Sequence, residues 1–204
     1  MAYKDFTLSD LQEQFQVENK VVKLFDEADI VPIQPSEVLR LQLEQAQKLR
    51  LKSEKARSEF IVTPILLELR RINKSFFTIH SGDSLVADAE KGLMGECDFI
   101  LAKDKRTFNI SSPLIQIVQA ENHDMELGVN QCAIQAYGTY LFNQKSGLKI
   151  ERIYGCVTTA RLWRFLALEN NVIKIDNLTY YESQLDTILG IFQQIIDYYK
   201  SVID

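Results

Sequence analysis

The chain has 204 residues, of which 46% are hydrophobic, and it contains eight glycines and four prolines. This length and composition are typical of one globular domain, and they exclude a disordered, collagen-like or repeat protein. The 23 basic and 28 acidic residues give a net charge of -5. That charge argues against indiscriminate binding to nucleic acid or to an anionic membrane, but it leaves a site-specific contact open.

Membrane and disulfide signals are also missing from the sequence. No apolar run approaches the roughly 20 residues of a membrane helix, and the first residues lack a hydrophobic signal core behind a basic leader. We therefore expect a cytoplasmic protein that does not enter a membrane. The three scattered cysteines, Cys97, Cys132 and Cys156, favour reduced, buried thiols. With only two histidines, any metal must be bound by oxygen ligands.

The N-terminal third is predicted to be mainly helical. A short helix begins near the capping pattern Thr7-x-x-Asp10, and an apolar packing arm follows it. Residues 37–60 are rich in Leu, Glu, Gln, Lys, Arg and Ala and lack Gly and Pro, which is typical of a long helix. Pro64 interrupts this pattern, so we expect a kinked rod or two helices that meet near Thr63.

After Lys74 the pattern changes to short strands. Apolar or alternating runs separated by turn residues predict a meander of four strands, at 76–79, 84–87, 98–101 and 114–118. The elements expected after them are a helix at 126–142, strands at 150–158, 162–168 and 172–175, and an amphipathic helix from about Ser183. Helices and strands in this order predict an α/β fold.

Polar residues that interrupt the buried strands form the candidate site. Asp98 opens one strand, and Gln119 and Glu121 stand two positions apart at the end of the next. Burying such groups costs several kcal/mol unless a partner such as a divalent cation compensates. Because side chains alternate along a strand, Gln119 and Glu121 share a face, with Cα atoms roughly 6.5–7 Å apart. Asp98 joins them if the two strands pair.

The order of these features resembles the PD-(D/E)XK nuclease superfamily, which has the restriction-endonuclease-like fold. The features are a helix with Glu68, a hairpin, Gly-x-x-Asp at 95–98, a strand that ends in Gln-x-Glu at 119–121, and a helix with Gln131. The resemblance implies a mixed β-sheet flanked by helices.

Two further stretches extend the likeness to bacterial, often cyanobacterial, members of unknown role. They are Glu-Lys-Ala-Arg-Ser-Glu at 54–59 and Gly-x-x-Thr-x-x-x-x-Trp-x-Phe at 155–165. On this resemblance, residues 1–55 are an N-terminal helical extension and residues 56–204 are the nuclease-like domain.

In this superfamily the first acid and the first position of the E-x-K element bind Mg²⁺, the carbonyl between them adds a ligand, and the lysine positions or activates water. Asp98 matches the first acid, whereas Gln119 stands where the second acid is expected and Glu121 where lysine is expected. The resemblance implies that Mg²⁺ or Mn²⁺ is bound by Asp98, Gln119, the Ala120 carbonyl and Glu121. It also implies that Gln131 orients water or phosphate. The catalytic residues implied are therefore Asp98, Gln119, Glu121, Gln131 and Glu68.

The activity implied is Mg²⁺-dependent hydrolysis of DNA phosphodiester bonds. With one carboxylate fewer, Mg²⁺ is held less tightly, and without the lysine the deprotonation of water depends more on the metal. The alternative is a catalytically decayed nuclease fold that serves as a nucleic-acid-binding or protein-interaction module. A third interpretation is a structural homodimer built through the long N-terminal helix.

Structural roles remain open for each candidate. Asp98 can be a capped acid at a strand start, Gln119 and Glu121 can belong to a strand end that emerges into water, and Glu68 can pair with an arginine of its own helix. Trp163 is expected to pack in a hairpin together with Phe165, rather than to stack on bases.

The charge is unevenly distributed along the chain. Residues 37–74 hold nine basic and five acidic residues, a net charge of +4, so the rest of the chain carries -9. The run from Lys48 to Arg57 is either a solvated helix face or a surface that follows a DNA backbone. The overall charge therefore limits non-specific affinity and leaves a local phosphate contact open.

Overall fold

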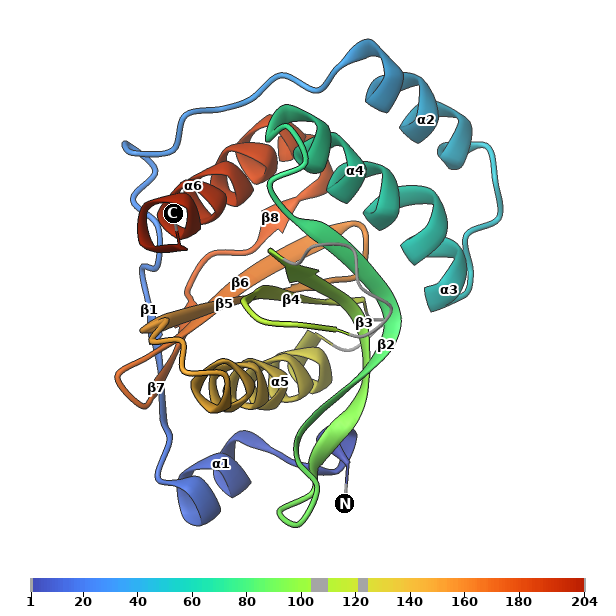
Figure 1. Cartoon of the computed structure of the whole chain (residues 1–204). Helices are drawn as coiled ribbons and strands as arrows, with labels where there is room; N and C mark the ends of the chain where they lie inside the picture. Colours follow the sequence, from blue (N-terminus) through green and yellow to red (C-terminus); the bar gives the residue numbers. More distant parts are fainter. Residues whose placement is uncertain (1, 104–109, 121–124, 204) are drawn as a thin grey trace.

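A mixed, mostly antiparallel β-sheet between two layers of helices forms the centre of the protein (Figure 1). The computed structural model describes residues 2–103, 110–120 and 125–203. Within these residues the sheet has eight strands, in the order β1-β7-β6-β5-β4-β3-β2, and β8 pairs with β6. The strands are β1 (Glu18–Val22), β2 (Thr78–Asp88), β3 (Leu93–Ala102), β4 (Leu114–Ala120), β5 (Arg152–Thr158), β6 (Leu162–Glu169), β7 (Val172–Asp176) and β8 (Tyr180–Tyr181).

Helices cover both faces of this sheet. In Figure 1, α5 and α1 lie on one side, and α4 and α6 lie on the other, with α2 outside α4. The helices are α1 (Leu8–Phe15), α2 (Glu37–Gln47), α3 (Glu54–Arg57), α4 (Thr63–Ile72), α5 (Met125–Lys145) and α6 (Leu185–Ile203). Short 3₁₀ turns at Tyr3–Asp5 and Glu182–Gln184 and a π-helical turn at Ser58–Val62 complete the described elements.

The strand directions follow from the connections. β2, β3 and β4 are antiparallel neighbours, so an antiparallel meander is present, with three strands in place of the expected four. β4 and β5 run parallel because α5 connects them across one face of the sheet. The expectation of an α/β fold with a mixed sheet flanked by helices is therefore confirmed at this level.

The first two expected strands, at 76–79 and 84–87, are wrong as separate elements, because they form the single strand β2. The turn expected at 81–83 stays within the ladder, since Ser81 lies opposite Phe99 and Asp83 lies opposite Cys97. Gly82 has a φ of 72°, a value that glycine adopts at little cost. The glycine therefore accommodates a local irregularity without ending the strand.

The long helix expected over 37–60 is also wrong, because α2 ends at Gln47. Ser53 caps a new helix by accepting a hydrogen bond from the backbone N–H of Ala56 at 3.1 Å. The Arg57 side chain donates to the Leu51 carbonyl at 3.2 Å and holds the connection. Pro64 lies in the first turn of α4, directly after the π-helical turn, so the expected irregularity near Thr63 is present and takes this form.

The N-terminal segment contributes to the sheet and to the core. β1 pairs in parallel with β7 at the edge of the sheet, and the buried side chains of Tyr3 and Leu11 belong to the same hydrophobic cluster as the sheet. The expected packing of Trp163 and Phe165 is confirmed: both are 0% exposed, and their rings lie 6.0 Å and 5.2 Å from that of Phe192 in α6.

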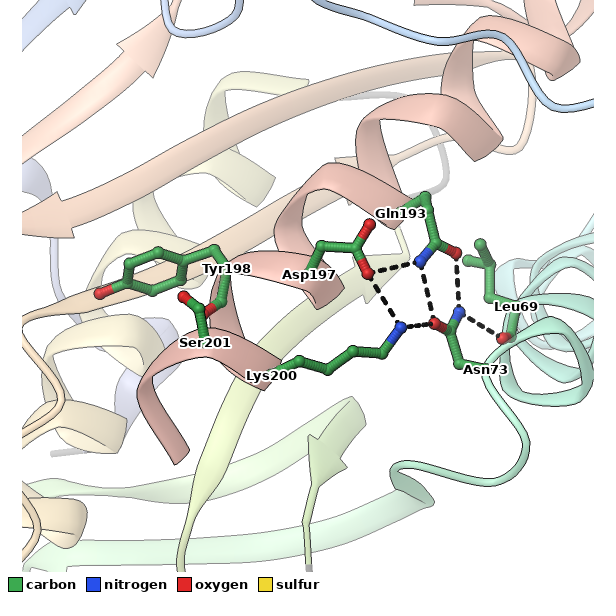
Figure 2. A network of polar contacts seen from close by, with 7 residues as sticks. All are labelled: Leu69, Asn73, Gln193, Asp197, Tyr198, Lys200 and Ser201. Carbon is green, nitrogen blue, oxygen red and sulfur yellow. Dashed lines mark hydrogen bonds and ion pairs between the residues drawn. The ribbon is translucent and has the colours of Figure 1, made fainter. Parts of the chain in front are cut away.

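A polar network joins the end of α4 to α6 (Figure 2). The side-chain amides of Asn73, at the end of α4, and Gln193, in α6, donate to each other at 2.8 and 2.9 Å. Lys200 donates to Asn73 at 2.6 Å and to Asp197 at 2.9 Å. Since Asn73 is 6% exposed, this network satisfies a polar group that would otherwise be buried without partners.

None of the helices in residues 2–103, 110–120 and 125–203 combines the length and the apolar character needed to span a bilayer.

Candidate functional site

Asp98 and Gln119 lie on neighbouring strands. β3 and β4 pair antiparallel, with Phe99 opposite Val118, and the next position in this register places Asp98 opposite Gln119. Directly opposed residues of an antiparallel pair point to the same face of the sheet. The pairing of these two strands, on which the candidate site depends, is therefore confirmed.

Helix α5 lies over this pair and contacts both strands. Gln131 donates from Nε2 to Oε1 of Gln119 at 3.2 Å. One helical turn later, Gln135 donates to the carbonyl oxygen of Glu96 in β3 at 3.2 Å. The spacing of four residues puts both glutamines on the face of α5 that meets the sheet. Gln119 is only 4% exposed, and its side-chain amide is held in place by the hydrogen bond from α5.

A cleft of about 510 Å³ opens beside these residues and is lined by Asp98, Gln119 and Gln131. The structure thus brings together three of the five predicted catalytic residues. Other lining residues, which the sequence did not single out as site residues, include Lys4, Glu54 and Glu96. Glu54 lies within the 54–59 stretch that carries part of the family resemblance, whereas no pattern in the sequence marks Lys4.

The cleft is rich in carboxylates. Asp98, Glu54 and Glu96 line it together with one lysine, Lys4. The neighbouring thiol responds to this environment: burial, followed by the negative charge of Asp98, raises the pKa of Cys97. All three cysteines are buried and free, which confirms that they form no disulfide.

Glu68 lies away from this cleft and has structural partners. Its carboxylate accepts hydrogen bonds from the backbone N–H of Ser36 at 3.0 Å and from the Ser36 hydroxyl at 3.1 Å. Arg71 donates to the same carboxylate at 3.0 and 3.1 Å. Burial raises the pKa of Glu68, but the hydrogen bonds from Arg71 and Ser36 outweigh it and lower the pKa overall. The pairing of Glu68 with an arginine of its own helix, one of the two roles that the sequence left open, is therefore present.

The remaining predicted ligands are described only in part. Ala120 is the last residue of β4 and pairs with Thr158 of β5, and Glu121 lies outside the described residues. In the part of the chain that the structure describes, no group of three or more His, Cys, Asp or Glu side chains is placed to hold a metal.

This donor set does not by itself fit a Mg²⁺ site. Hard cations are held by charged oxygen ligands. Of the predicted ligands that are described, only Asp98 carries a charge, and the Gln119 oxygen already accepts the hydrogen bond from Gln131. Metal ligation remains a prediction, and it requires the carboxylate of Glu121.

Comparisons with protein-family models, with curated proteins and with solved structures gave no match. The protein is therefore classified by its fold and its cleft alone. It is a mixed α/β protein with an acidic cleft where β3 and β4 meet α5.

Proposed function

We propose that this protein is a DNA-binding domain of nuclease-like architecture in which the cleft at Asp98 and Gln119 no longer cleaves DNA. The observation that carries the proposal is the hydrogen bond from Gln131 to Gln119. At the position where the family resemblance expects a second metal-binding acid, the chain has a neutral, buried amide engaged with its neighbour. Such a pair supplies no charge to hold a cation.

The arrangement of elements supports the nuclease-like part of this proposal. Helix α4, the hairpin of β2 and β3, strand β4 and helix α5 follow one another in the order that the resemblance implies. Asp98 and Gln119 also lie opposite each other, in the register continued from the Phe99–Val118 pair.

The basic segment Lys48–Arg57 supports DNA as the ligand. It contains five basic residues and one acidic residue, and Lys48, Arg50, Lys52 and Lys55 are exposed. The acidic residue, Glu54, lines the cleft, so the basic segment borders it. Because the cleft itself repels phosphate through its carboxylates, the attraction for DNA comes from this segment.

Binding is tested by fluorescence anisotropy with a labelled DNA duplex at increasing salt. We expect the triple variant Lys48→Glu, Lys52→Glu and Lys55→Glu to bind DNA at least about 10-fold more weakly than the wild type. Its binding constant should also fall less steeply as the salt concentration rises. A matched variant changes three exposed lysines elsewhere, Lys20, Lys91 and Lys149, to glutamate and should bind more tightly than the first. Equal losses in both variants would show that only overall charge matters and would contradict a specific role for the segment.

A Mg²⁺-dependent phosphodiesterase is the second candidate function, and it is favoured by the meeting of Asp98, Gln119 and Gln131 in one cleft. In this candidate, Asp98, Glu121 and the Ala120 carbonyl would hold Mg²⁺ or Mn²⁺, with Gln119 as a weaker ligand, and the chemistry supplied there would be Lewis-acid polarisation of a phosphate.

A plasmid cleavage assay with Mg²⁺ or Mn²⁺ distinguishes the two functions. We expect no cleavage by the wild type and a gain of metal-dependent cleavage in the double variant Gln119→Glu and Glu121→Lys. Cleavage by the wild type that Asp98→Ala abolishes would establish the phosphodiesterase instead. Calorimetric titration of the wild type with both metals, with and without DNA, gives an independent measure of metal binding.

A further inference from the structure

A second and larger hollow lies beside the cleft. It has a volume of about 980 Å³, and its walls come from residues 46–61 on one side and from the turn between β5 and β6, together with β8, on the other. We refer to it as the groove. Its lining includes Leu49, Leu51, Arg57, Arg161 and Tyr181.

The groove adjoins the cleft at the carboxyl end of β4. Ala120 in β4 pairs with Thr158 in β5, and the groove lining begins at the following residue, Thr159. On the other wall, Glu54 lines the cleft and Arg57, three residues later in α3, lines the groove.

The charges around the groove favour an anionic ligand. Arg57 and Arg161 line it, against one acid among its lining residues, Glu182. The basic segment Lys48–Arg57 contributes Leu49, Leu51 and Arg57 to this lining. Arg57 and Arg161 would together attract the phosphates of a ligand in the groove.

One aromatic and several apolar side chains line the groove. Tyr181 is 58% exposed, whereas its neighbour Tyr180 is 3% exposed and donates its hydroxyl to Asp176 at 3.2 Å. Side chains alternate along a strand, so Tyr181 points away from the side on which Tyr180 is buried, and Tyr181 lines the groove. Tyr181 lies opposite Leu162 in the β6–β8 ladder, and Leu49, across the groove, is 48% exposed.

The turn that forms one wall is held rigidly. The Thr158 hydroxyl donates to the Leu162 carbonyl at 2.9 Å and accepts from the Ala160 N–H at 2.9 Å, while the Trp163 indole donates to the Ala160 carbonyl at 3.2 Å. Ala160 has a φ of 70°, a conformation that costs free energy for a residue other than glycine and that surrounding contacts must maintain. A wall fixed in this way loses little conformational freedom when a ligand binds.

From these features we infer that the groove binds single-stranded DNA, with Tyr181 stacked on a base and Arg57 and Arg161 at the phosphates. A duplex presents mainly its phosphates and keeps its bases paired, so it offers no base face to the aromatic and apolar lining. A single strand offers both a base face and a backbone, which is the combination that aromatic and cationic grooves bind. This inference rests on the proposed function of DNA binding and specifies the form of the DNA.

The test is anisotropy with a labelled oligothymidylate of about 16 nucleotides, with unlabelled single strand and duplex of equal length as competitors. We expect the single strand to compete better than the duplex. Tyr181→Ala should weaken binding of the single strand about 10-fold, whereas Tyr181→Phe, which keeps the ring, should bind like the wild type. Because Tyr181 is exposed, its variants should unfold at the same denaturant concentration as the wild type.

The charge contribution is tested with Arg161→Glu, matched to Arg40→Glu on the exposed side of α2. Only Arg161→Glu should weaken binding, and it should reduce the slope of log K against log salt concentration by about one. If duplex competes as well as single strand and Tyr181→Ala changes neither, the groove inference is overturned while DNA binding stands. If neither form of DNA binds, both proposals are overturned.

Discussion

Glu68 of α4 accepts two hydrogen bonds from Ser36, one from its backbone N–H and one from its hydroxyl. Ser36 is the N-cap of α2, and its hydroxyl oxygen also accepts from the Leu39 N–H at 3.2 Å. One buried carboxylate on α4 therefore fixes the start of another helix. Since α2 leads directly into the basic segment Lys48–Arg57, this contact also positions the surface that we propose for DNA.

Replacement of Glu68 should destabilise the protein. Glu68→Gln keeps the size of the side chain but removes the charge that accepts from Ser36 and Arg71, and we expect a loss of about 1–3 kcal/mol in the free energy of unfolding, measured with urea. Glu44→Gln is the matched control, because Glu44 pairs with Lys48 at an exposed position, and this substitution should change stability by less than about 0.5 kcal/mol. Equal effects of the two substitutions would contradict the capping role.

The contribution of Glu68 should depend on pH. Its pKa in the folded state lies below the ordinary value of 4.5, so on acidification the unfolded state takes up the proton first. The stabilisation is complete above about pH 4.5 and is lost as the pH falls through the lower, folded-state pKa. We expect the stability difference between wild type and Glu68→Gln to shrink over that range in urea titrations at several pH values. A difference that stayed constant down to pH ~3 would argue that Glu68 is not ionised in the fold.

Gly190→Ala should destabilise the protein, although this change usually stabilises a helix. Gly190 lies in α6, and a Cβ there would be 2.5 Å from the Val31 carbonyl oxygen. The backbone must move to relieve this contact, so we expect a loss of about 1–3 kcal/mol, measured by thermal or urea unfolding. Gln194→Ala, at an exposed position of the same helix, should be nearly neutral. A stabilised Gly190→Ala protein would show that the Val31 carbonyl does not lie against α6 at Gly190.

The Asn73–Gln193 amide pair should be energetically coupled. Each single alanine variant removes the two hydrogen bonds between the amides, so each should cost about 1–2 kcal/mol, while the double variant should cost less than the sum of the two. The quantity to measure is the coupling energy from a double-mutant cycle in urea. Gln194→Ala in place of Gln193→Ala provides the uncoupled control. Strict additivity in the first cycle would contradict the reciprocal pair drawn in Figure 2.

Local signals predicted most of the elements because they depend on near neighbours in the chain. The apolar periodicity over 126–142 corresponds to α5, and the alternating runs near 98–101, 114–118 and 162–168 correspond to β3, β4 and β6. The errors occurred where distant contacts outweigh local preference. Residues 81–83 resemble a turn, but the pairing of Ser81 and Asp83 with β3 keeps them within one strand. The stretch 37–60 favours a helix throughout, but contacts around Ser53 and Arg57 interrupt it.

For the candidate site, the sequence by itself determined which residues are polar within apolar strands, and the alternation along a strand indicated that Gln119 and Glu121 share a face. Only the tertiary structure decided that Asp98 and Gln119 line the same cleft, that Gln131 donates a hydrogen bond to the side-chain oxygen of Gln119, and that Glu68 accepts hydrogen bonds from the N-cap residue of α2. The physical reason is that hydrogen bonds between residues far apart in the chain depend on how strands and helices are assembled. Local periodicity carries no information about that assembly.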